Sequence, residues 1–446
     1  MKTVIMAGGM GTRIASVRSD VPKPMIEIGG KPILEHQMEN LKACGLTDIT
    51  LVVGHLGDVI RQYFGDGSRY GLRISYFVED HPLGTAGALF QMPELTEDFL
   101  LLCGDVMIDV DFNRFADFHR KNRAWASLMA HPNGHPYDSS LLVTEIVPPQ
   151  EPGGLPTDSH RVVRWLAKED ERLYYKNRVN AGIQMISPEL LAETRRNIAS
   201  GKQPLRHPET PDKIDLDRDV LKPNIGSGRI FAYDTPEYIK DMGTPDRFYE
   251  TEQDLLSGKI HARNLKHPQK AIFLDRDGTI NVSKGWLNNA EDLELIPGVA
   301  SAIRKINQSG YLAIVVTNQP VIARGECSFD ELQRIHERME TELGKEGALG
   351  DGLYFCPHHK DKGFAGERLE YKVDCDCRKP KPGLLLQTAR DFNIDLQASF
   401  MIGDSKRDVE AGQNAGCREC VLIGENQPNA LLEAVDKILK SFEDKL

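Results

Sequence analysis

The feature that most restricts the fold is an alternation of short apolar, strand-like runs with helix-like segments, in which several runs lead into glycine, asparagine or aspartate. In the first half these runs include TVIM, which precedes a glycine cluster, and FLLLCGD. In the second half they include KAIFLD, GYLAIVVTN and ASFMIGD. Strands that alternate with helices predict parallel α/β sheets, with functional loops at the carboxyl ends of the strands. We therefore expect an α/β protein with two Rossmann-like domains.

The 446 residues fit two or three domains. A polar, mildly basic stretch at 251–268 is interpreted as a linker between predicted domains at 1–250 and 269–446. A segment rich in proline and glycine at 147–160, VPPQEPGGLPTDSH, predicts an exposed excursion within the first domain.

The formal net charge of -11 argues against a nucleic-acid partner, which would require a basic face. It does not argue against phosphate ligands, because charges more than about 8 Å away are largely screened at physiological salt. No apolar run is long enough to cross a bilayer, and MKTVIMAGGMGTR lacks the pattern of a signal peptide. We expect a cytoplasmic protein with small-molecule partners and neither nucleic acid nor membrane. The sequence predicts no particular oligomeric state.

The first candidate site is the loop AGGMGTR, from Ala7 to Arg13, which directly follows a predicted strand. It has neither the Gly-Lys-Ser/Thr of a Walker loop nor the third glycine of a dinucleotide fingerprint. It offers exposed backbone N–H groups and then a cation, which suits a triphosphate. A second cation, Lys23, lies between two prolines that fix its backbone. The alternative is a simple turn beside surface carboxylates.

Residues 1–250 resemble the sugar-1-phosphate nucleotidyltransferases in a series of motifs: GGMGTR, PKP, VEDHPLGTAGAL, LLLCGD, VNAGIQMIS and IKDMGTP. The resemblance implies that Arg13 and Lys23 stabilise the triphosphate and that Asp105 and Asp241 bind Mg²⁺. The implied nucleotide-binding residues are Gly8, Gly9, Gly11, Thr12 and Gly84. The implied residues at the sugar, base or sugar phosphate are Glu79, Lys168 and Asn180. One departure is Ala167, where the family usually has glutamate before the lysine.

This reaction joins two anions, the sugar phosphate and the nucleoside triphosphate, which repel each other. Catalysis then consists mostly of positioning and of charge stabilisation by cations and metal. No covalent intermediate with the protein is required.

The second candidate site begins at FLDRDGTIN, where Asp275 and Asp277 follow an apolar strand. Two buried carboxylates repel each other unless a cation or a shared proton intervenes, and Mg²⁺ with a phosphoryl group would satisfy both. Asp404 follows another predicted strand and could complete the metal site. Side chains that could bind phosphate oxygens are Thr317, Asn318 and Lys379. The alternative is an acidic surface loop.

These four elements resemble the haloacid-dehalogenase superfamily, over roughly residues 270–425. The resemblance implies that Asp275 attacks phosphorus and forms an aspartyl-phosphate. It also implies that Asp277 protonates the leaving oxygen and then activates water. Asp275, Asp277 and Asp404 would form the Mg²⁺ site.

A third candidate site combines FCPHH with VDCDCRKPKPG. Cys356, His358, Cys375 and Cys377 have donor types and spacing that suit a tetrahedral structural zinc, with His359 as a rival ligand. Zinc contributes about 10–16 kcal/mol in structural peptide sites. A disulfide across a comparable loop contributes about 2–4 kcal/mol, and a reducing cytosol disfavours it. The other clustered pair, Cys417-x-x-Cys420, is interpreted as packing.

This loop also resembles that of the heptose bisphosphate phosphatases and the related histidinol phosphatases, in its Cys-Pro-His-His and Cys-x-Cys-Arg-Lys-Pro text. There zinc shapes a wall of the substrate site, and Arg378 and Lys379 would reach the substrate phosphates. Two departures are Pro320-Val321, where Ser-Gly is usual, and a longer zinc loop.

A phosphatase and a nucleotidyltransferase on one chain suit successive steps on a sugar bisphosphate. From the resemblances we expect removal of the 7-phosphate of D-glycero-α-D-manno-heptose 1,7-bisphosphate, followed by GMP transfer from GTP to the 1-phosphate. One alternative is a mannose-1-phosphate guanylyltransferase joined to a histidinol-phosphate-type phosphatase. Another is a binding protein with an inactive nucleotidyltransferase half.

Overall fold

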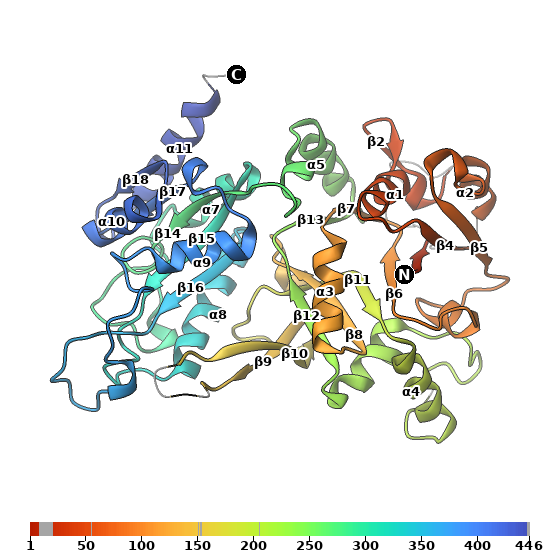
Figure 1. Ribbon diagram of the computed structural model, residues 1–446, viewed down its shortest axis with the longest axis horizontal. Helices are drawn as coiled ribbons and strands as arrows, with labels where there is room; N and C mark the ends of the chain where they lie inside the picture. The colour runs from red at the N-terminus through yellow and green to blue at the C-terminus, as the bar shows by residue number, and fades with distance from the viewer. Residues whose placement is uncertain (9–20, 55, 150, 152–153, 205, 444–446) are drawn as a thin grey trace. The chain divides into compact units, whose positions relative to one another are not determined.

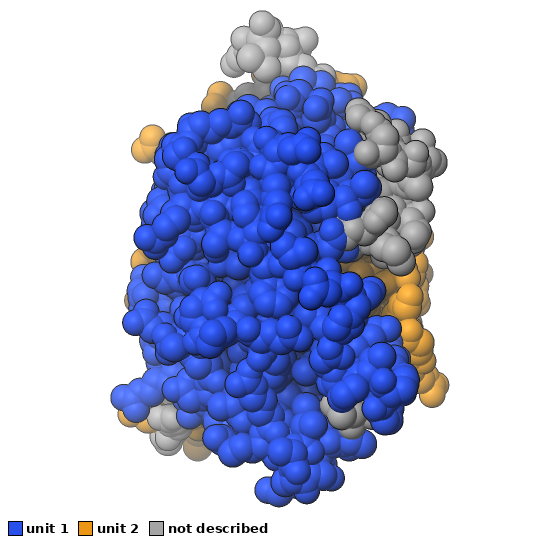
Figure 2. Space-filling model, turned by 90° about the vertical axis from the view of Figure 1, so that its right-hand side faces the viewer, with its two compact units in different colours: residues 1–130, 160–165, 180–264 blue, residues 131–159, 166–179, 265–446 orange. Residues whose placement is uncertain are grey.

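The computed structural model describes residues 1–8, 21–54, 56–149, 151, 154–204 and 206–443. The chain forms two compact units, which Figure 2 colours blue and orange. Unit 1 comprises residues 1–130, 160–165 and 180–264. Unit 2 comprises residues 131–159, 166–179 and 265–446. Each unit is described by itself.

Unit 1 is built on a mixed sheet with the strand order β5-β4-β1-β6-β11-β8-β12-β10 (Figure 1). The strands are β1 Thr3–Met6, β4 Asp48–Val53, β5 Arg73–Val78, β6 Phe99–Cys103, β8 Ala126–His131, β10 Thr157–Leu166, β11 Val179–Ile186 and β12 Ile230–Asp234. β1 pairs in parallel with β4 and β6, and β11 runs antiparallel to β6. The carboxyl ends of β1 and β6 therefore lie at one edge, where the predicted glycine loop and Asp105 follow them.

Two small ribbons and several helices complete unit 1. The ribbons pair β2 Glu27–Ile28 with β3 Lys31–Pro32, and β7 Val106–Asp109 with β13 Tyr238–Asp241. The helices are α1 Ile33–Ala43, α2 Gly57–Phe64, α3 Phe112–Asn122, α4 Pro188–Ala199, α5 Pro245–Leu256 and α6 Lys259–Ala262. Apolar residues of α1, α2 and α3 share a core with inward-facing residues of β1, β4 and β6. This core holds the strand ends that carry the site.

Unit 2 contains a parallel sheet with the order β16-β15-β14-β17-β18. Its strands are β14 Lys270–Leu274, β15 Tyr311–Asn318, β16 Gly352–Cys356, β17 Phe400–Gly403 and β18 Glu419–Leu422. Helices α7 Val299–Gln308, α8 Phe329–Lys345 and α11 Ala430–Glu443 supply one apolar layer, and α9 Gly383–Phe392 and α10 Lys406–Ala415 supply the other. The central strands β14, β15 and β17 are almost continuously apolar because both of their faces are covered. The predicted α/β class is confirmed.

The predicted domain boundaries do not coincide with the units. Residues 131–159 and 166–179, including β9 Leu141–Val147 and the short helix η5 Pro136–Asp138, belong to unit 2. The predicted excursion at 147–160 overlaps the start of β10, and the predicted linker includes the end of α5 and all of α6. The boundaries at 250 and 269 stay a prediction. Within the described residues, no helix is long and apolar enough to cross a membrane.

The aromatic residue Phe273 anchors the core of unit 2. It is fully buried on central strand β14, whose neighbours are β15 and β17. Replacing Phe273 with alanine should lower the free energy of unfolding of this unit by about 3–5 kcal/mol, because a large cavity remains. Urea unfolding followed by the fluorescence of Trp286, with Trp125 and Trp165 replaced by phenylalanine, measures the change. Leu422→Ala, at an exposed position on β18, is the control, and an equal effect there would contradict the expectation.

Candidate active sites and metal centre

Unit 1 brings together three of the predicted residues, Lys23, Asp105 and Asp241. Asp241 ends β13 and lies opposite Val106, the first residue of β7, so the sheet register places it beside Asp105. The ammonium group of Lys23, on the short helix η2 Lys23–Met25, pairs with the carboxylate of Asp105 and lies 3.5 Å from Asp241 Oδ1. Arg247 Nη1 lies 2.6 Å from the other oxygen of Asp241. Two carboxylates and two cations thus converge at the end of the sheet.

The donor set of Asp105 and Asp241 fits Mg²⁺. Both are hard oxygen donors, and a Mg²⁺ site with one or two carboxylates leaves coordination positions for substrate phosphates. The surroundings are strongly anionic. The pKa of the neighbouring Cys103 thiol is raised to about 12. Burial is the largest cause, and the negative charges of Asp105, Asp217 and Asp241 add to it. Asp105 and Asp241 would hold the metal, and their ligand roles stay a prediction.

The predicted nucleotide and sugar residues are only partly described. Gly9, Gly11, Thr12 and Arg13 lie outside the described residues. A Cβ at Gly8 would lie 3.0 Å from Glu79 Oε2, so the carboxylate of Glu79 lies beside the start of the glycine loop. Gly84 has a φ of +79° and packs against the backbone of Ile214. Asn180, on β11, accepts a hydrogen bond of 3.4 Å from the amide of Gly182. Lys168 is exposed on the turn after β10 and belongs to unit 2.

In unit 2, Asp275 lies next to a buried lysine. Asp275 directly follows β14, and its amide donates to the carbonyl of Ile402 on β17 at 3.0 Å. Lys379 is only 2% exposed. Its Nζ lies 2.8 Å from Asp275 Oδ1 and 2.6 Å from Asp408 Oδ1, and it donates to the carbonyl of Val316 at 2.8 Å. A fixed cation therefore stands beside the predicted nucleophile.

Three carboxylates, from Asp275, Asp404 and Asp408, lie close enough to hold one metal ion. Burial raises the pKa of Asp275 to about 6, and burial together with the charges of Asp275 and Asp408 raises the pKa of Asp404 to about 7. These raised pKa values mean that nearby positive charge does not fully balance the negative charges of the carboxylates. A divalent cation would balance them. Gly278 (φ +81°) makes room for the cluster, since a Cβ there would lie 2.2 Å from Asp404 Oδ2. The residues fit Mg²⁺.

The carboxylate of Asp277 makes a different set of contacts. Arg276, which is fully buried, donates to both oxygens of Asp277 at 2.8 Å. Asn281 donates to Oδ1 at 3.0 Å, and Gln319 donates to Oδ2 at 2.9 Å. Although burial acts in the opposite direction, Arg276 lowers the pKa of Asp277. Asp277 is held in its ionised form, which suits a general base. Its predicted metal and acid/base roles stay predictions.

Thr317 and Asn318 end β15 as predicted. The side chain of Asn318 and the backbone of Lys379 form two reciprocal hydrogen bonds, of 3.0 and 3.1 Å. The hydroxyl of Thr317 accepts from Gln319 Nε2 at 2.8 Å. Asn318 therefore fixes the backbone of the lysine that contacts Asp275.

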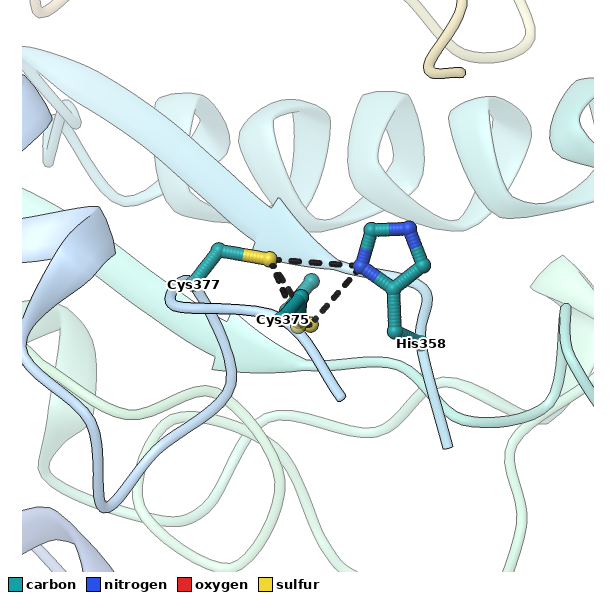
Figure 3. A group of neighbouring side chains, drawn as sticks. His358, Cys375 and Cys377 are labelled. Atoms are coloured by element: carbon teal, nitrogen blue, oxygen red, sulfur yellow. Dashed lines mark hydrogen bonds between the residues drawn. The ribbon is translucent and has the colours of Figure 1, made fainter. Parts of the chain in front are cut away.

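Cys356, His358, Cys375 and Cys377 converge in one cluster. The three sulfur atoms lie 3.1 to 3.5 Å apart, and His358 Nδ1 lies 3.4 Å from Cys377 Sγ and 3.7 Å from Cys356 Sγ. Figure 3 shows His358, Cys375 and Cys377 with their donor atoms pointing toward one another.

These separations fit four ligands around one tetrahedral zinc, given zinc–ligand distances of about 2.0–2.3 Å. The pKa of His358 is raised to about 10, most strongly by its contact with Cys375 and next by its contact with Cys377. Positive charge is therefore stabilised at this point. The rival ligand His359 is absent from the described cluster. The cluster can hold a metal, and zinc is the proposal that its donors favour.

Three arginines lie near this cluster. Burial lowers the pKa of Arg378, Cys356 as the next largest cause raises it, and the charges of Arg407 and Arg324 lower it. Arg324 is 8% exposed and packs between the rings of Trp286 and Phe364, 3.8 and 4.4 Å from their centroids. In the described part of the chain, no carboxylate lies within ion-pair distance of any of these arginines. This group of three arginines suits an anionic ligand.

Sequence reasoning missed several residues of these sites. Asp408, in the first turn of α10, lies four residues after Asp404, and the spacing Gly-Asp-x-x-x-Asp could have indicated it. Arg276 lies between two predicted catalytic aspartates and could have been suspected for that reason. Asp217, whose pKa burial raises to about 6, carries no comparable sequence signal.

Comparison with protein families supports the predicted class of both the N-terminal and the C-terminal part of the chain. Residues 2–139 match the Nucleotidyl transferase family, and residues 376–445 match the HAD-hydrolase-like family. The chain thus combines a nucleotidyltransferase domain with a phosphatase domain of the haloacid-dehalogenase class, and the predicted combination is confirmed.

Relatives narrow the class further. D-glycero-beta-D-manno-heptose-1,7-bisphosphate 7-phosphatase of Pasteurella multocida is 42% identical over 182 residues, which are 39% of this chain and 96% of that protein. The enzyme of the same name from Haemophilus influenzae is 43% identical over 160 residues, which are 36% of this chain and 84% of that protein. The chain belongs to the family of these phosphatases.

Two solved structures are also similar. HddC from Yersinia pseudotuberculosis, in complex with GMP-PN, is 23% identical and matches over 57% of this chain and 99% of its own, with a TM-score of 0.44. D,D-heptose 1.7-bisphosphate phosphatase from B. bronchiseptica, in complex with magnesium and phosphate, is 29% identical and matches over 39% of this chain and 99% of its own, with a TM-score of 0.34.

The metal cluster predicts a measurable zinc content. The purified protein should contain about one zinc per chain, and Cys375→Ser should lose it, because serine is a poor zinc ligand. Atomic emission measures the metal, and the thermal unfolding midpoint should fall together with the zinc content. Cys417→Ser, outside the cluster, should keep its zinc. Full zinc content in Cys375→Ser would contradict the assignment.

Proposed function

We propose that the chain is a bifunctional enzyme of sugar-nucleotide synthesis. Its unit 2 removes the 7-phosphate of a D-glycero-D-manno-heptose 1,7-bisphosphate, and its nucleotidyltransferase domain then transfers GMP from GTP to the remaining 1-phosphate. The products are inorganic phosphate, GDP-heptose and pyrophosphate. The observation that carries the proposal is the buried Asp275–Lys379–Asp408 cluster, in a chain of which 182 residues match a heptose bisphosphate phosphatase at 42% identity.

The phosphatase reaction uses Asp275 as nucleophile. A carboxylate oxygen of Asp275 attacks the phosphorus, and the bond between phosphorus and the sugar oxygen breaks. Asp277 must take up a proton before the first step; it then gives this proton to the leaving sugar oxygen and, as the carboxylate, takes a proton from the water that hydrolyses the aspartyl-phosphate. Lys379 stabilises the nucleophile and the charge on the phosphoryl oxygens. Bound Mg²⁺ would offset the negative charge of the phosphoryl group and of Asp275 and Asp404.

The arginine cluster supports a bisphosphate substrate. The charges of Arg324 and Arg407 both act on Arg378, and none of the three has a carboxylate partner among the described residues. A phosphate dianion that is not cleaved would neutralise them, and planar guanidinium groups bind phosphate in a bidentate manner. We assign the sugar's second phosphate to this cluster.

The nucleotidyltransferase reaction uses charge compensation without a covalent intermediate. An oxygen of the sugar 1-phosphate attacks the α-phosphorus of GTP, and the bond to the leaving pyrophosphate breaks. Lys23, with Arg13 from the glycine loop, stabilises the negative charge that accumulates at phosphorus. Asp105 and Asp241 would hold Mg²⁺, which neutralises phosphate oxygens. Glu79, Gly84, Lys168 and Asn180 bind the base, sugar and sugar phosphate.

Three parts of the proposal rest on resemblance to the guanylyltransferases of heptose metabolism. They are GTP as the nucleotide, the α anomer as the substrate and the cytoplasm as the location. The phosphatase relatives are named for the β anomer. The anomer is therefore the part of the proposal that an experiment should address first.

The two activities should separate by mutation. Asp275→Asn should reduce phosphate release from the bisphosphate at least about 10³-fold, because the nucleophile is lost. It should leave guanylyl transfer to a heptose 1-phosphate unchanged. Lys23→Ala should give the reverse pattern, because a cation next to the triphosphate is lost. Colorimetric phosphate release and chromatography of GDP-sugar measure the two activities. Loss of both activities in Asp275→Asn would contradict the assignment of the two activities to separate sites.

Phosphorus NMR can test the substrate. With Mg²⁺ and the α-configured heptose 1,7-bisphosphate, the 7-phosphate signal should disappear, and a diphosphate-sugar signal should appear after GTP is added. The β anomer and histidinol phosphate serve as comparison substrates. Preferential turnover of either would leave the phosphatase chemistry intact and overturn the proposed substrate.

A further inference from the structure

Asp241 in unit 1 contacts a different cation with each of its carboxylate oxygens. Lys23 Nζ lies 3.5 Å from Oδ1, and Arg247 Nη1 lies 2.6 Å from Oδ2. Lys23 also pairs with Asp105. The proposed nucleotidyl transfer uses Lys23, Asp105 and Asp241, whereas Arg247 has no part in it. A cation that contacts a predicted metal ligand calls for a function of its own.

The chain turns sharply between Asp241 and Arg247. Gly243 lies between them, and a Cβ there would lie 2.8 Å from Asp241 Oδ2, the oxygen that Arg247 contacts. Thr244 is the N-cap of α5, accepts a hydrogen bond from the amide of Arg247, and is followed by Pro245 at the first helical position. The missing side chain and the fixed start of the helix together place the guanidinium beside the carboxylate.

An apolar core holds this turn in place. Phe248 follows Arg247, Met242 follows Asp241, and both are buried in the same hydrophobic cluster. The amide of Met242 donates to the carbonyl of Asp105 at 3.2 Å. The backbones that carry Asp105, Asp241 and Arg247 are therefore fixed relative to one another within unit 1.

The charged groups themselves remain accessible to a ligand. The side chain of Arg247 is 22% exposed, that of Asp241 is 46% exposed and that of Asp105 is 35% exposed. The dipole of α5 favours an anion, not a cation, in the first turn where Arg247 lies. Arg247 thus requires a neighbouring anion, and Asp241 supplies one.

A divalent cation at Asp241 competes with Arg247 for the same carboxylate. Mg²⁺ binds carboxylate oxygens at about 2.0–2.1 Å and accepts little distortion of its octahedral geometry. A guanidinium beside Oδ2 repels such an ion. Once the charge of Asp241 is neutralised by the ion, the attraction that keeps Arg247 on this carboxylate is lost.

The charges of the whole group indicate where Arg247 then binds. The formal charges of Asp105, Asp241, Lys23 and Arg247 cancel, and a bound Mg²⁺ leaves two positive charges in excess. Such an excess attracts phosphate groups. A guanidinium that no longer contacts a carboxylate can bind phosphate oxygens through two parallel hydrogen bonds.

We propose that Arg247 is a phosphate-binding residue of the nucleotidyltransferase site. It pairs with Asp241 until a divalent cation binds that carboxylate, and it then pairs with a phosphate oxygen of the nucleoside triphosphate or of the sugar 1-phosphate. The inference rests on the proposed function, because it takes Asp105 and Asp241 as the metal ligands of a nucleotidyl transfer. It adds a cation whose position depends on the metal.

Binding of Mn²⁺, measured by electron paramagnetic resonance, tests the competition. Mn²⁺ prefers the same oxygen ligands as Mg²⁺. The full-length protein carries Asp404→Asn in these measurements, which removes a carboxylate of the other metal group. In this background Arg247→Ala should bind Mn²⁺ about two- to fivefold more tightly, because a competing cation is gone. An unchanged or weaker affinity for Mn²⁺ would overturn the proposal.

Calorimetry with phosphate ligands tests the second contact. In the same background and at saturating Mg²⁺, Arg247→Ala should bind GTP or mannose 1-phosphate at least about tenfold more weakly, because a charge-assisted hydrogen bond is lost. A weaker affinity for GTP assigns Arg247 to the triphosphate, and a weaker affinity for mannose 1-phosphate assigns it to the sugar phosphate. Unchanged affinities for both ligands would overturn the proposal.

Three further variants control for charge and for folding. Arg247→Lys keeps the charge and should bind Mn²⁺ as the wild type does, and Arg247→Gln should repeat both changes of Arg247→Ala with less loss of packing. Lys240→Ala removes a cation next to Asp241 in the chain that pairs with Glu250 and Asp254. It should change each affinity less than about twofold. A damaged fold would weaken both kinds of binding, whereas the proposal requires tighter metal and weaker phosphate binding.

These binding measurements separate the inference from the proposed function. A wild type that forms no nucleotide sugar from GTP and either α-configured heptose 1-phosphate or mannose 1-phosphate would overturn the proposed function. The affinities of Arg247→Ala for Mn²⁺ and for the phosphate ligands would still decide the role of Arg247. A wild type that forms the nucleotide sugar, together with unchanged affinities in Arg247→Ala, would overturn this inference alone.

Discussion

The phosphatase site depends on one buried cation, the ammonium group of Lys379. A lysine that is almost completely buried is strongly destabilising unless it is paired. Here Asp275 and Asp408 pair with it, and the carbonyl of Val316 accepts a third bond. Asp275 directly follows β14, Asp408 lies in the first turn of α10, and Val316 lies on β15. Lys379 therefore connects three elements at this edge of the sheet. Removing Lys379 would leave the buried carboxylates of Asp275 and Asp408 without their cation.

The same lysine links the catalytic site to the metal cluster. Cys377 lies only two residues before Lys379, and both reciprocal bonds to Asn318 involve the Lys379 backbone. The loop from 357 to 374 contains few large apolar residues and cannot be held by a core of its own. A metal bound by the three cysteines and His358 would fix the end of this loop. Such a metal would also hold the backbone that leads to Arg378 and Lys379.

Much of the fold and part of each site could be predicted from the sequence, because the signals are local. Apolar runs that end in aspartate identified the strand ends that carry Asp105, Asp275 and Asp404. The four residues that converge in the Cys/His cluster could be selected from the sequence because cysteine and histidine clusters are rare outside metal sites. The contacts of Asp277 could not be predicted, because Gln319 comes from another strand end and the rotamer depends on packing. The attachment of residues 166–179 to α8 also has no local signal, since its partners lie more than 160 positions away in the chain.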